Sequence, residues 1–242
     1  MKKILILSIS FIILIATANA QSVLDGVKKA VSVNNSGLGA GLSNDDIVSG
    51  LKTALTQGAQ KSADKLSAVN GFLGDAAVKI LMPPEAQKAE KALRSAGMGS
   101  LVDNAITSMN HAAEDAAKSA APIFVGAVKN MSVSDALGIL RGSDTSATVY
   151  LKKNTTANLT QSFKPVIDAS LVKTNATKYW HDVFDAYNKL PFVKKINPDL
   201  SAYVTEKAIS GIFYYVAQEE IKIRKDPAGQ ASAILQKVFG GK

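Results

Sequence analysis

Only two histidines, His111 and His181, are available for metal binding or for proton transfer near neutral pH. His181 and Asp185 are four residues apart and would share one face of a helix. Two ligands are too few for a metal site without a third, and the paired Glu-x-x-His motif of di-iron bundles is absent. A surface ion pair is the simpler interpretation of His181. His111, three residues before Glu114, is expected to be polar surface.

The adjacent acids Glu219 and Glu220 resemble an acid/base pair, but neighbouring helical residues point about 100° apart. They cannot converge on one atom, and a solvated helix end is the favoured interpretation. The chain has no cysteine, which excludes disulfides and thiolate nucleophiles. It has no phosphate-binding loop and no Gly-x-Ser-x-Gly motif either. The sequence therefore names no catalytic residue, no metal site and no cofactor.

The most distinctive polar segment runs from Leu140 to Thr148, and Arg141, Ser143, Asp144 and Thr145 are its candidate ligand-binding residues. In one interpretation, Gly142 stops a helix and Ser143 or Asp144 caps the next. In the other, Arg141 and the free amides of the next helix bind an anion. Capping is favoured, because a carboxylate beside the site has the wrong sign for an anion.

Residues 1–20 have the features of a secretory signal peptide. Lys2 and Lys3 precede an unbroken apolar run, and Ala18-Asn19-Ala20 supplies the small residues that a signal peptidase accepts. We expect cleavage between Ala20 and Gln21. The apolar run is short for a membrane anchor, and no later run approaches spanning length, so we expect a soluble mature chain without a transmembrane segment.

The chain has a formal charge of +8, and removal of two lysines with residues 1–20 leaves a mature charge of +6. Such a surface suits acidic partners, and an anionic envelope component or a lipid is the candidate. Lysines are spread along the chain, and arginine occurs only at Arg94, Arg141 and Arg224. Nucleic-acid surfaces concentrate arginine, and export separates the chain from nucleic acid, so no nucleic-acid partner is expected.

Apolar residues at helical spacing organise the rest of the chain. Residues 21–42 are expected to form a short helix and a Gly/Asn-rich linker, and residues 43–242 an all-helical domain. Ser43 with Asp46, and Ser132 with Asp135, predict capped helix starts. Further helices are expected from Pro84 to about residue 96, from Ser100, through 123–131, from 133 to 141, and after Asp226.

Three expectations concern the interior of these helices. Residues 76–81 are expected to add one or two helical turns, and residues 145–174 to form two helices broken near Lys153-Asn154-Thr155. An aromatic stripe follows at Tyr179, Trp180, Phe184 and Tyr187, before a turn between Pro191 and Pro198. The helix after Asp199 is apolar nearly all round, so Ile212, Phe213 and Val216 are expected inside. Together these patterns predict an all-α fold, a single multi-helix bundle.

Several segments resemble a family of exported bacterial proteins catalogued as domain of unknown function 4197. They are 50–55 (GLKTAL), 70–74 (NGFLG), 141–145 (RGSDT), 187–191 (YNKLP) and 203–208 (YVTEKA). The resemblance covers roughly residues 45–240, with the motifs in the same order. It implies a helical domain in the bacterial periplasm or envelope, and it implies no activity.

The sequence favours a non-enzymatic envelope protein that binds a ligand or partner. An enzyme of unknown type with a polar site near Arg141 and Asp144 is one alternative. A peripheral lipid-binding protein is another, because helical bundles with positive surfaces can take apolar chains between their helices.

Overall fold

The structure, a computed structural model, describes residues 43–178, 180, 181, 184 and 199–226. Every regular element within those ranges is helical, which confirms the all-α prediction. The elements are α2 (Asn44–Ser67), η1 (Pro84–Ala86), α3 (Gln87–Ser95), α4 (Gly99–Ala117), α5 (Ala120–Lys129), α6 (Val133–Arg141), α7 (Ser146–Lys173) and α9 (Leu200–Lys225). The signal peptide, segment 21–42, Asp185, Tyr179, Tyr187, the turn between Pro191 and Pro198 and the last predicted helix lie outside the described residues.

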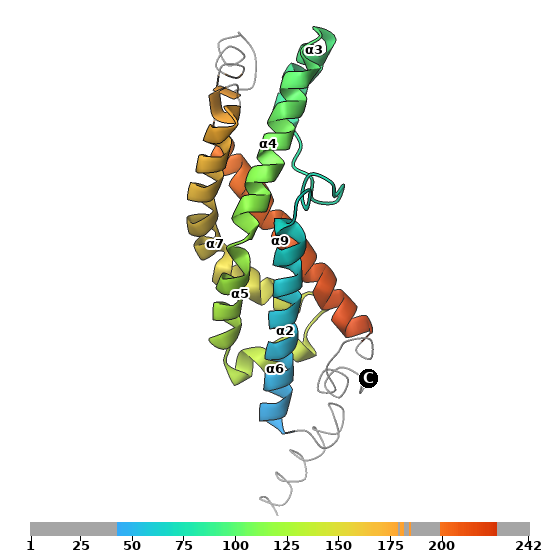
Figure 1. Cartoon of the computed structure of the whole chain (residues 1–242). Helices are drawn as coiled ribbons and strands as arrows, with labels where there is room; N and C mark the ends of the chain where they lie inside the picture. Colours follow the sequence, from blue (N-terminus) through green and yellow to red (C-terminus); the bar gives the residue numbers. More distant parts are fainter. Residues whose placement is uncertain (1–42, 179, 182–183, 185–198, 227–242) are drawn as a thin grey trace, which may run out of the picture.

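The helices form an elongated bundle around one continuous apolar core. α4 contacts both α2 and α7 along the long axis, and α9 crosses these three helices diagonally (Figure 1). α5 follows α4 along the axis, and α6 runs across the end of the bundle (Figure 1). No single helix among the described residues is long and apolar enough to cross a membrane. One bent pair, Gly99–Lys129 with Val133–Arg141, passes by length and composition but turns by 106°.

Two predicted capping boxes are present and fix where helices begin. The Ser43 hydroxyl accepts a 3.1 Å bond from the Asp46 amide, and the Asp46 carboxylate accepts the Ser43 amide at 3.1 Å. Ser132 and Asp135 repeat the arrangement with the same distances and start α6. Each box satisfies amides that the first turn leaves without a helical partner.

The start of α4 differs from its prediction. α3 ends as expected, because Gly97 adopts a positive φ of 79° that favours glycine. α4 then begins at Gly99 after Met98, and no side chain caps it, so the prediction that Ser100 is its cap is wrong. The predicted restart near Pro122 is confirmed: α4 ends at Ala117 and α5 begins at Ala120, two residues before the proline.

α7 is one helix of 28 residues, so the predicted break near Lys153-Asn154-Thr155 is wrong. The polar side chains there bond to their own helix, Asn154 to the Tyr150 carbonyl at 2.8 Å and the Thr155 hydroxyl to the Leu151 carbonyl at 2.6 Å. A buried stripe also runs through the whole helix at every fourth residue: Leu151, Thr155, Leu159, Phe163, Ile167 and Leu171. Tertiary packing along that stripe outweighs the weak local propensity.

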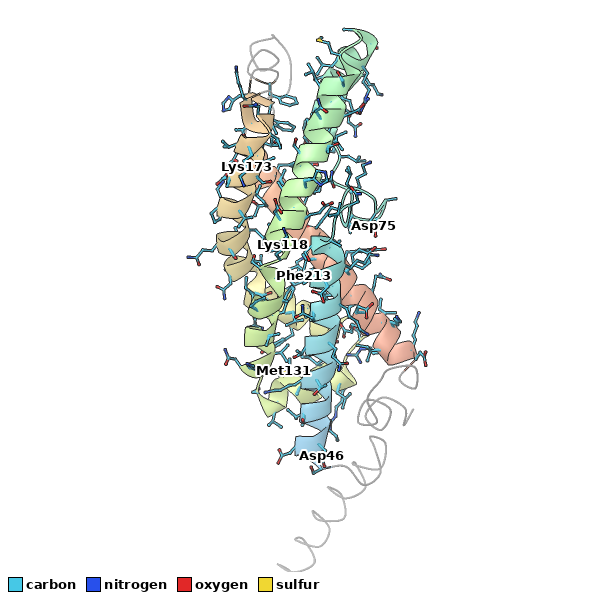
Figure 2. All side chains as sticks on the ribbon, in the orientation of Figure 1. Asp46, Asp75, Lys118, Met131, Lys173 and Phe213 are labelled. Carbon is cyan, nitrogen blue, oxygen red and sulfur yellow. The ribbon has the colours of Figure 1, made fainter. Side chains whose placement is uncertain are left out.

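α9 has a buried face and an exposed face. Ile212, Phe213 and Val216 are 0%, 6% and 5% exposed, as predicted, and the Phe213 ring meets Phe124 edge to face at 5.7 Å. Figure 2 places Phe213 at the centre of the bundle. The opposite side of α9 is exposed at Ser210 and Tyr214, so this apolar helix is not buried on all sides. From the predicted aromatic stripe, Trp180 and Phe184 are buried with ring centroids 4.4 Å apart.

Candidate functional site

The turn between α6 and α7 holds the four candidate residues that the sequence singled out. Arg141, Ser143 and Asp144 are exposed and Thr145 is half-buried. Gly142 ends α6, as predicted. Thr145 precedes α7, and its side chain makes no capping hydrogen bond. The prediction that Ser143 or Asp144 caps this helix is therefore wrong.

Glu220 of α9 supplies the cap instead, although 72 residues separate it from Thr148. Its Oε1 accepts the Ala147 amide at 2.9 Å, and its Oε2 accepts the amide and the hydroxyl of Thr148, both at 2.8 Å. The Glu220 side chain is 5% exposed, so the prediction of a solvated helix end is wrong for this residue. A buried carboxylate therefore accepts hydrogen bonds from first-turn amides of α7 that have no partner within the helix.

Arg224, one turn further along α9, completes the cluster. Its guanidinium donates to Glu220 Oε1 at 2.9 and 3.1 Å and to the Ile139 carbonyl near the end of α6 at 2.8 Å. The pair thus places an anion at the start of one helix and a cation at the end of another, as both helix dipoles favour. The only advance indication was the four-residue spacing of Glu220 and Arg224.

This cluster bears on the anion hypothesis for the Arg141 turn. Two amides at the start of α7, those of Ala147 and Thr148, are already bonded to Glu220. An external anion would sit beside a buried charge of its own sign. Anion binding at Arg141 therefore stays a prediction, with fewer donors than the sequence suggested.

A second buried carboxylate holds the non-helical segment 68–83. Glu114 accepts the amides of Phe72 and Leu73 at 3.1 Å, and its other oxygen lies 2.8 Å from His111 Nδ1. The Glu114 side chain is 7% exposed, whereas the side chain of His111, the residue expected at the surface, is 43% exposed. Within the part of the chain described, no three acidic or histidine side chains are placed to hold a metal ion.

Asn110 fixes the same segment one turn earlier on α4. Its side-chain amide both donates to and accepts from the backbone of Ile80, each at 2.8 Å. Residues 76–78 lie in turns and residues 79–81 have no regular secondary structure, so the predicted helical turns are wrong there. Asn110 pairs with both backbone groups of Ile80, which are therefore not available for helical hydrogen bonds.

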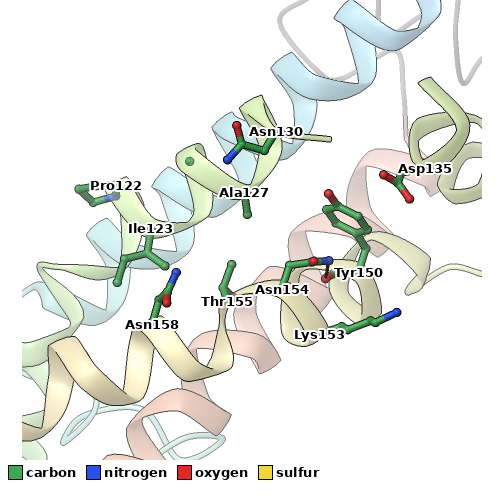
Figure 3. Close-up of a pocket in the computed structure, with 11 residues that line it drawn as sticks. Pro122, Ile123, Ala127, Asn130, Asp135, Tyr150, Lys153, Asn154, Thr155 and Asn158 are labelled. Atoms are coloured by element: carbon green, nitrogen blue, oxygen red, sulfur yellow. Dashed lines mark hydrogen bonds between the residues drawn. The ribbon is translucent and has the colours of Figure 1, made fainter. Parts of the chain in front are cut away.

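A groove of about 560 Å³ lies between α5 and α7, with α6 at one end. Figure 3 shows Thr155 and Asn158 of α7 directed toward Ile123 and Ala127 of α5. Polar groups line much of it: Asn130, Asp135, Tyr150, Lys153, Asn154, Thr155 and Asn158. Sequence reasoning missed this groove, because its lining comes from three helices and matches no motif.

Tyr150 and Asp135, two titratable groups of the groove, have shifted pKa values. Burial, with the nearby charge of Asp135, raises the pKa of Tyr150 above its ordinary value, so the phenol stays a donor at neutral pH. Hydrogen bonds from the Ser132 hydroxyl and amide lower the pKa of Asp135, which makes that carboxylate a weaker base. Asparagine amides donate and accept hydrogen bonds but transfer no proton near neutral pH.

Comparison with known proteins identifies a family and nothing finer. A protein-family profile described as "Protein of unknown function (DUF4197)" matches residues 41–240. No curated protein and no solved structure matches the chain.

Proposed function

We propose that this chain, which belongs to the DUF4197 family of proteins of unknown function, is a non-enzymatic binding protein of the bacterial envelope. The observation that carries the proposal is the α5–α7 groove, with side-chain amides of Asn130, Asn154 and Asn158. Ligand pockets are concave, and convergent polar groups in them fix the orientation of the ligand.

The chemistry of the groove favours binding over catalysis. Tyr150 is a protonated donor, and Asp135 is engaged in the capping box of α6, with bonds of 2.7 and 3.1 Å from Ser132. General acid/base catalysis needs a group whose pKa lies near the working pH, and the shifts of these two residues move them away from it.

The ligand class we infer is a saccharide chain of the envelope. Asparagine amides match sugar hydroxyls, because each amide offers both donors and an acceptor. The side chains of Pro122, Ile123 and Ala127 provide an apolar wall against which the C–H face of a sugar ring can pack. Lys153 at the α6 end adds one cation, which suits an acidic sugar or a neighbouring carboxylate.

The envelope location rests on residues 1–20, whose composition supports export and cleavage before Gln21. N-terminal sequencing of the protein from its own cells is expected to begin at Gln21. An intact Met1 in the membrane fraction would contradict that assignment.

Side-chain amide NMR tests the ligand site directly. A soluble saccharide fraction released from a bacterial envelope is expected to shift the amide signals of Asn130, Asn154 and Asn158. Asn110 is the internal control, because its amide is buried and bonded to Ile80 and Ile106. Unchanged signals from the three groove residues, or equal shifts of Asn110, would refute the proposed site.

A further inference from the structure

A second surface, away from the groove, lies where segment 77–81 packs on α9. The Tyr203 hydroxyl donates to the Leu81 carbonyl at 2.8 Å and joins the two elements. A hollow of about 380 Å³ between them is lined by Lys79, Leu81, Lys207, Ser210 and Tyr214, among others.

The backbone presents Lys79 and Leu81 to the outside. In segment 78–82, burial alternates strictly: Val78, Ile80 and Met82 are buried, whereas Lys79 and Leu81 are exposed. By this alternation, the lysine and the leucine share the outer side of the segment. Asn110 makes two 2.8 Å hydrogen bonds to the backbone of Ile80, the residue between Lys79 and Leu81. These bonds fix the backbone that carries the lysine and leucine side chains.

Apolar and aromatic groups protrude around this hollow. Leu81 is 56% exposed and Tyr214 is 42% exposed, so both large side chains lie at the surface rather than in the core. Tyr214 also meets Tyr215 edge to face, with ring centroids 5.2 Å apart, which restricts its orientation. Tyrosine with an exposed aliphatic side chain is the composition of surfaces that rest at a membrane–water interface.

The hollow carries positive charge. Among the residues that the structure describes, the charged side chains lining the hollow are Lys79 and Lys207, both exposed, and Lys207 Nζ lies 5.6 Å from the centre of the Tyr203 ring. Burial, and to a smaller extent the charges of Glu206 and Glu85, raises the pKa of Tyr203 to about 12, but neither glutamate lines the hollow. The hollow is thus complementary to anions.

We propose that the surface formed by Lys79, Leu81, Lys207 and Tyr214 docks the protein on an anionic lipid membrane. The lysines pair with lipid phosphates, while Leu81 and Tyr214 enter the boundary between headgroups and acyl chains. The proposal goes beyond saccharide binding, since it concerns a different surface and a different partner.

Vesicle co-sedimentation of the mature chain tests this docking. Vesicles of equal phosphatidylglycerol and phosphatidylcholine are expected to bind the protein, and pure phosphatidylcholine vesicles to bind it much more weakly. Lys79→Glu with Lys207→Glu is expected to lower binding to the anionic vesicles by about tenfold or more, since each lysine near an anionic surface contributes about fivefold. Leu81→Ser is expected to weaken binding at high salt, where the apolar contact dominates.

Lys88→Glu with Lys91→Glu is the matched control, because both lysines are exposed on α3 and the change in net charge is the same. Thermal melts confirm that each variant is folded. Absence of binding by the wild type, unchanged binding by the Lys79/Lys207 variant, or an equal loss in the α3 control would each overturn the proposal. Displacement from the vesicles by inorganic phosphate at matched ionic strength would also overturn it, as the site would then recognise a free anion.

Discussion

Glu220 and Arg224 lie one turn apart on α9, and their 2.9 Å ion pair joins the end of α6 to the start of α7. Both side chains are almost completely buried, at 5% and 7% exposed. Removal of one partner leaves the other charge buried and unpaired. This lowers the free energy of unfolding far more than removal of a surface ion pair does.

Glu220→Ala should therefore lower the free energy of unfolding by about 3–5 kcal/mol. The double variant Glu220→Leu with Arg224→Met should lose less stability than the sum of the losses in Glu220→Leu and Arg224→Met alone, because no lone charge remains. Urea unfolding of the wild type, Glu220→Ala, Glu220→Leu, Arg224→Met and the double variant measures both effects.

The pair Glu90 and Arg94 on α3 is the matched control, because it has the same four-residue spacing and a 3.0 Å contact but is much less buried, at 23% and 40% exposed. Glu90→Ala should cost less than about 1 kcal/mol. An equally small cost for Glu220→Ala, or strictly additive losses in the double variant, would show that the buried pair does not join the helices as described.

Asp75 provides an acid-dependent part of the stability. Figure 2 shows this residue on the segment beside α2 and α4. Its carboxylate accepts the Tyr215 hydroxyl and lies 3.0 Å from Lys65 Nζ, and these partners, Tyr215 first, hold its pKa below the ordinary 3.8. A lowered folded-state pKa stabilises the protein above the unfolded value, and this contribution is lost as the pH falls through the folded value.

Asp75→Asn should therefore flatten the decline in unfolding free energy between about pH 5 and about pH 2. Tyr215→Phe should flatten it in part, since it removes the largest cause of the shift. Urea unfolding across this range gives the slopes. A decline in Asp75→Asn as steep as in the wild type would contradict the assignment.

Three helical glycines should respond differently to alanine. A Cβ at Gly126 or Gly138 meets nothing within 4 Å, so Gly126→Ala and Gly138→Ala should each stabilise by about 0.5–1 kcal/mol. A Cβ at Gly211 would lie 2.6 Å from Phe72 Cε1, so Gly211→Ala should destabilise. Denaturant melts decide, and a stabilised Gly211→Ala would mean that α9 and Phe72 are less closely packed.

At the Arg141 turn, phosphate should have no specific effect on stability. Glu220 already occupies the amides of Ala147 and Thr148, and only a ligand that binds the folded state raises the melting temperature. Melts in phosphate and in chloride at matched ionic strength provide the comparison. A phosphate-specific rise that disappears in Arg141→Ala would restore the anion site.

Features that depend on neighbouring residues were predictable from the sequence. The capping boxes at Ser43 and Ser132 and the stop at Gly97 follow from local hydrogen bonding and backbone preference. The continuity of α7 was not predictable in this way, since its polar middle is sustained by a buried stripe against other helices.

The candidate site was harder to predict from the sequence than the helices, because it also depends on contacts between residues far apart in the chain. Glu220 and Glu114 are ordinary helix acids in the sequence, and their partners lie 72 and 42 residues away along the chain. The groove likewise depends on how α5, α6 and α7 pack, and only the assembled fold brings Asn130 opposite α7.

The central claim, that the α5–α7 groove holds an envelope ligand, is tested most directly by filling it. Phenylalanine at Gly126 would enter the groove, whereas at Gly138, an exposed α6 position with equal open space, it would not. Each protein would be purified from the envelope of the cells that produce it and analysed by native mass spectrometry. The wild type and Gly138→Phe should show the added mass of a bound saccharide, and Gly126→Phe should not. The same bound mass on Gly126→Phe, or no bound mass on the wild type, would contradict the account.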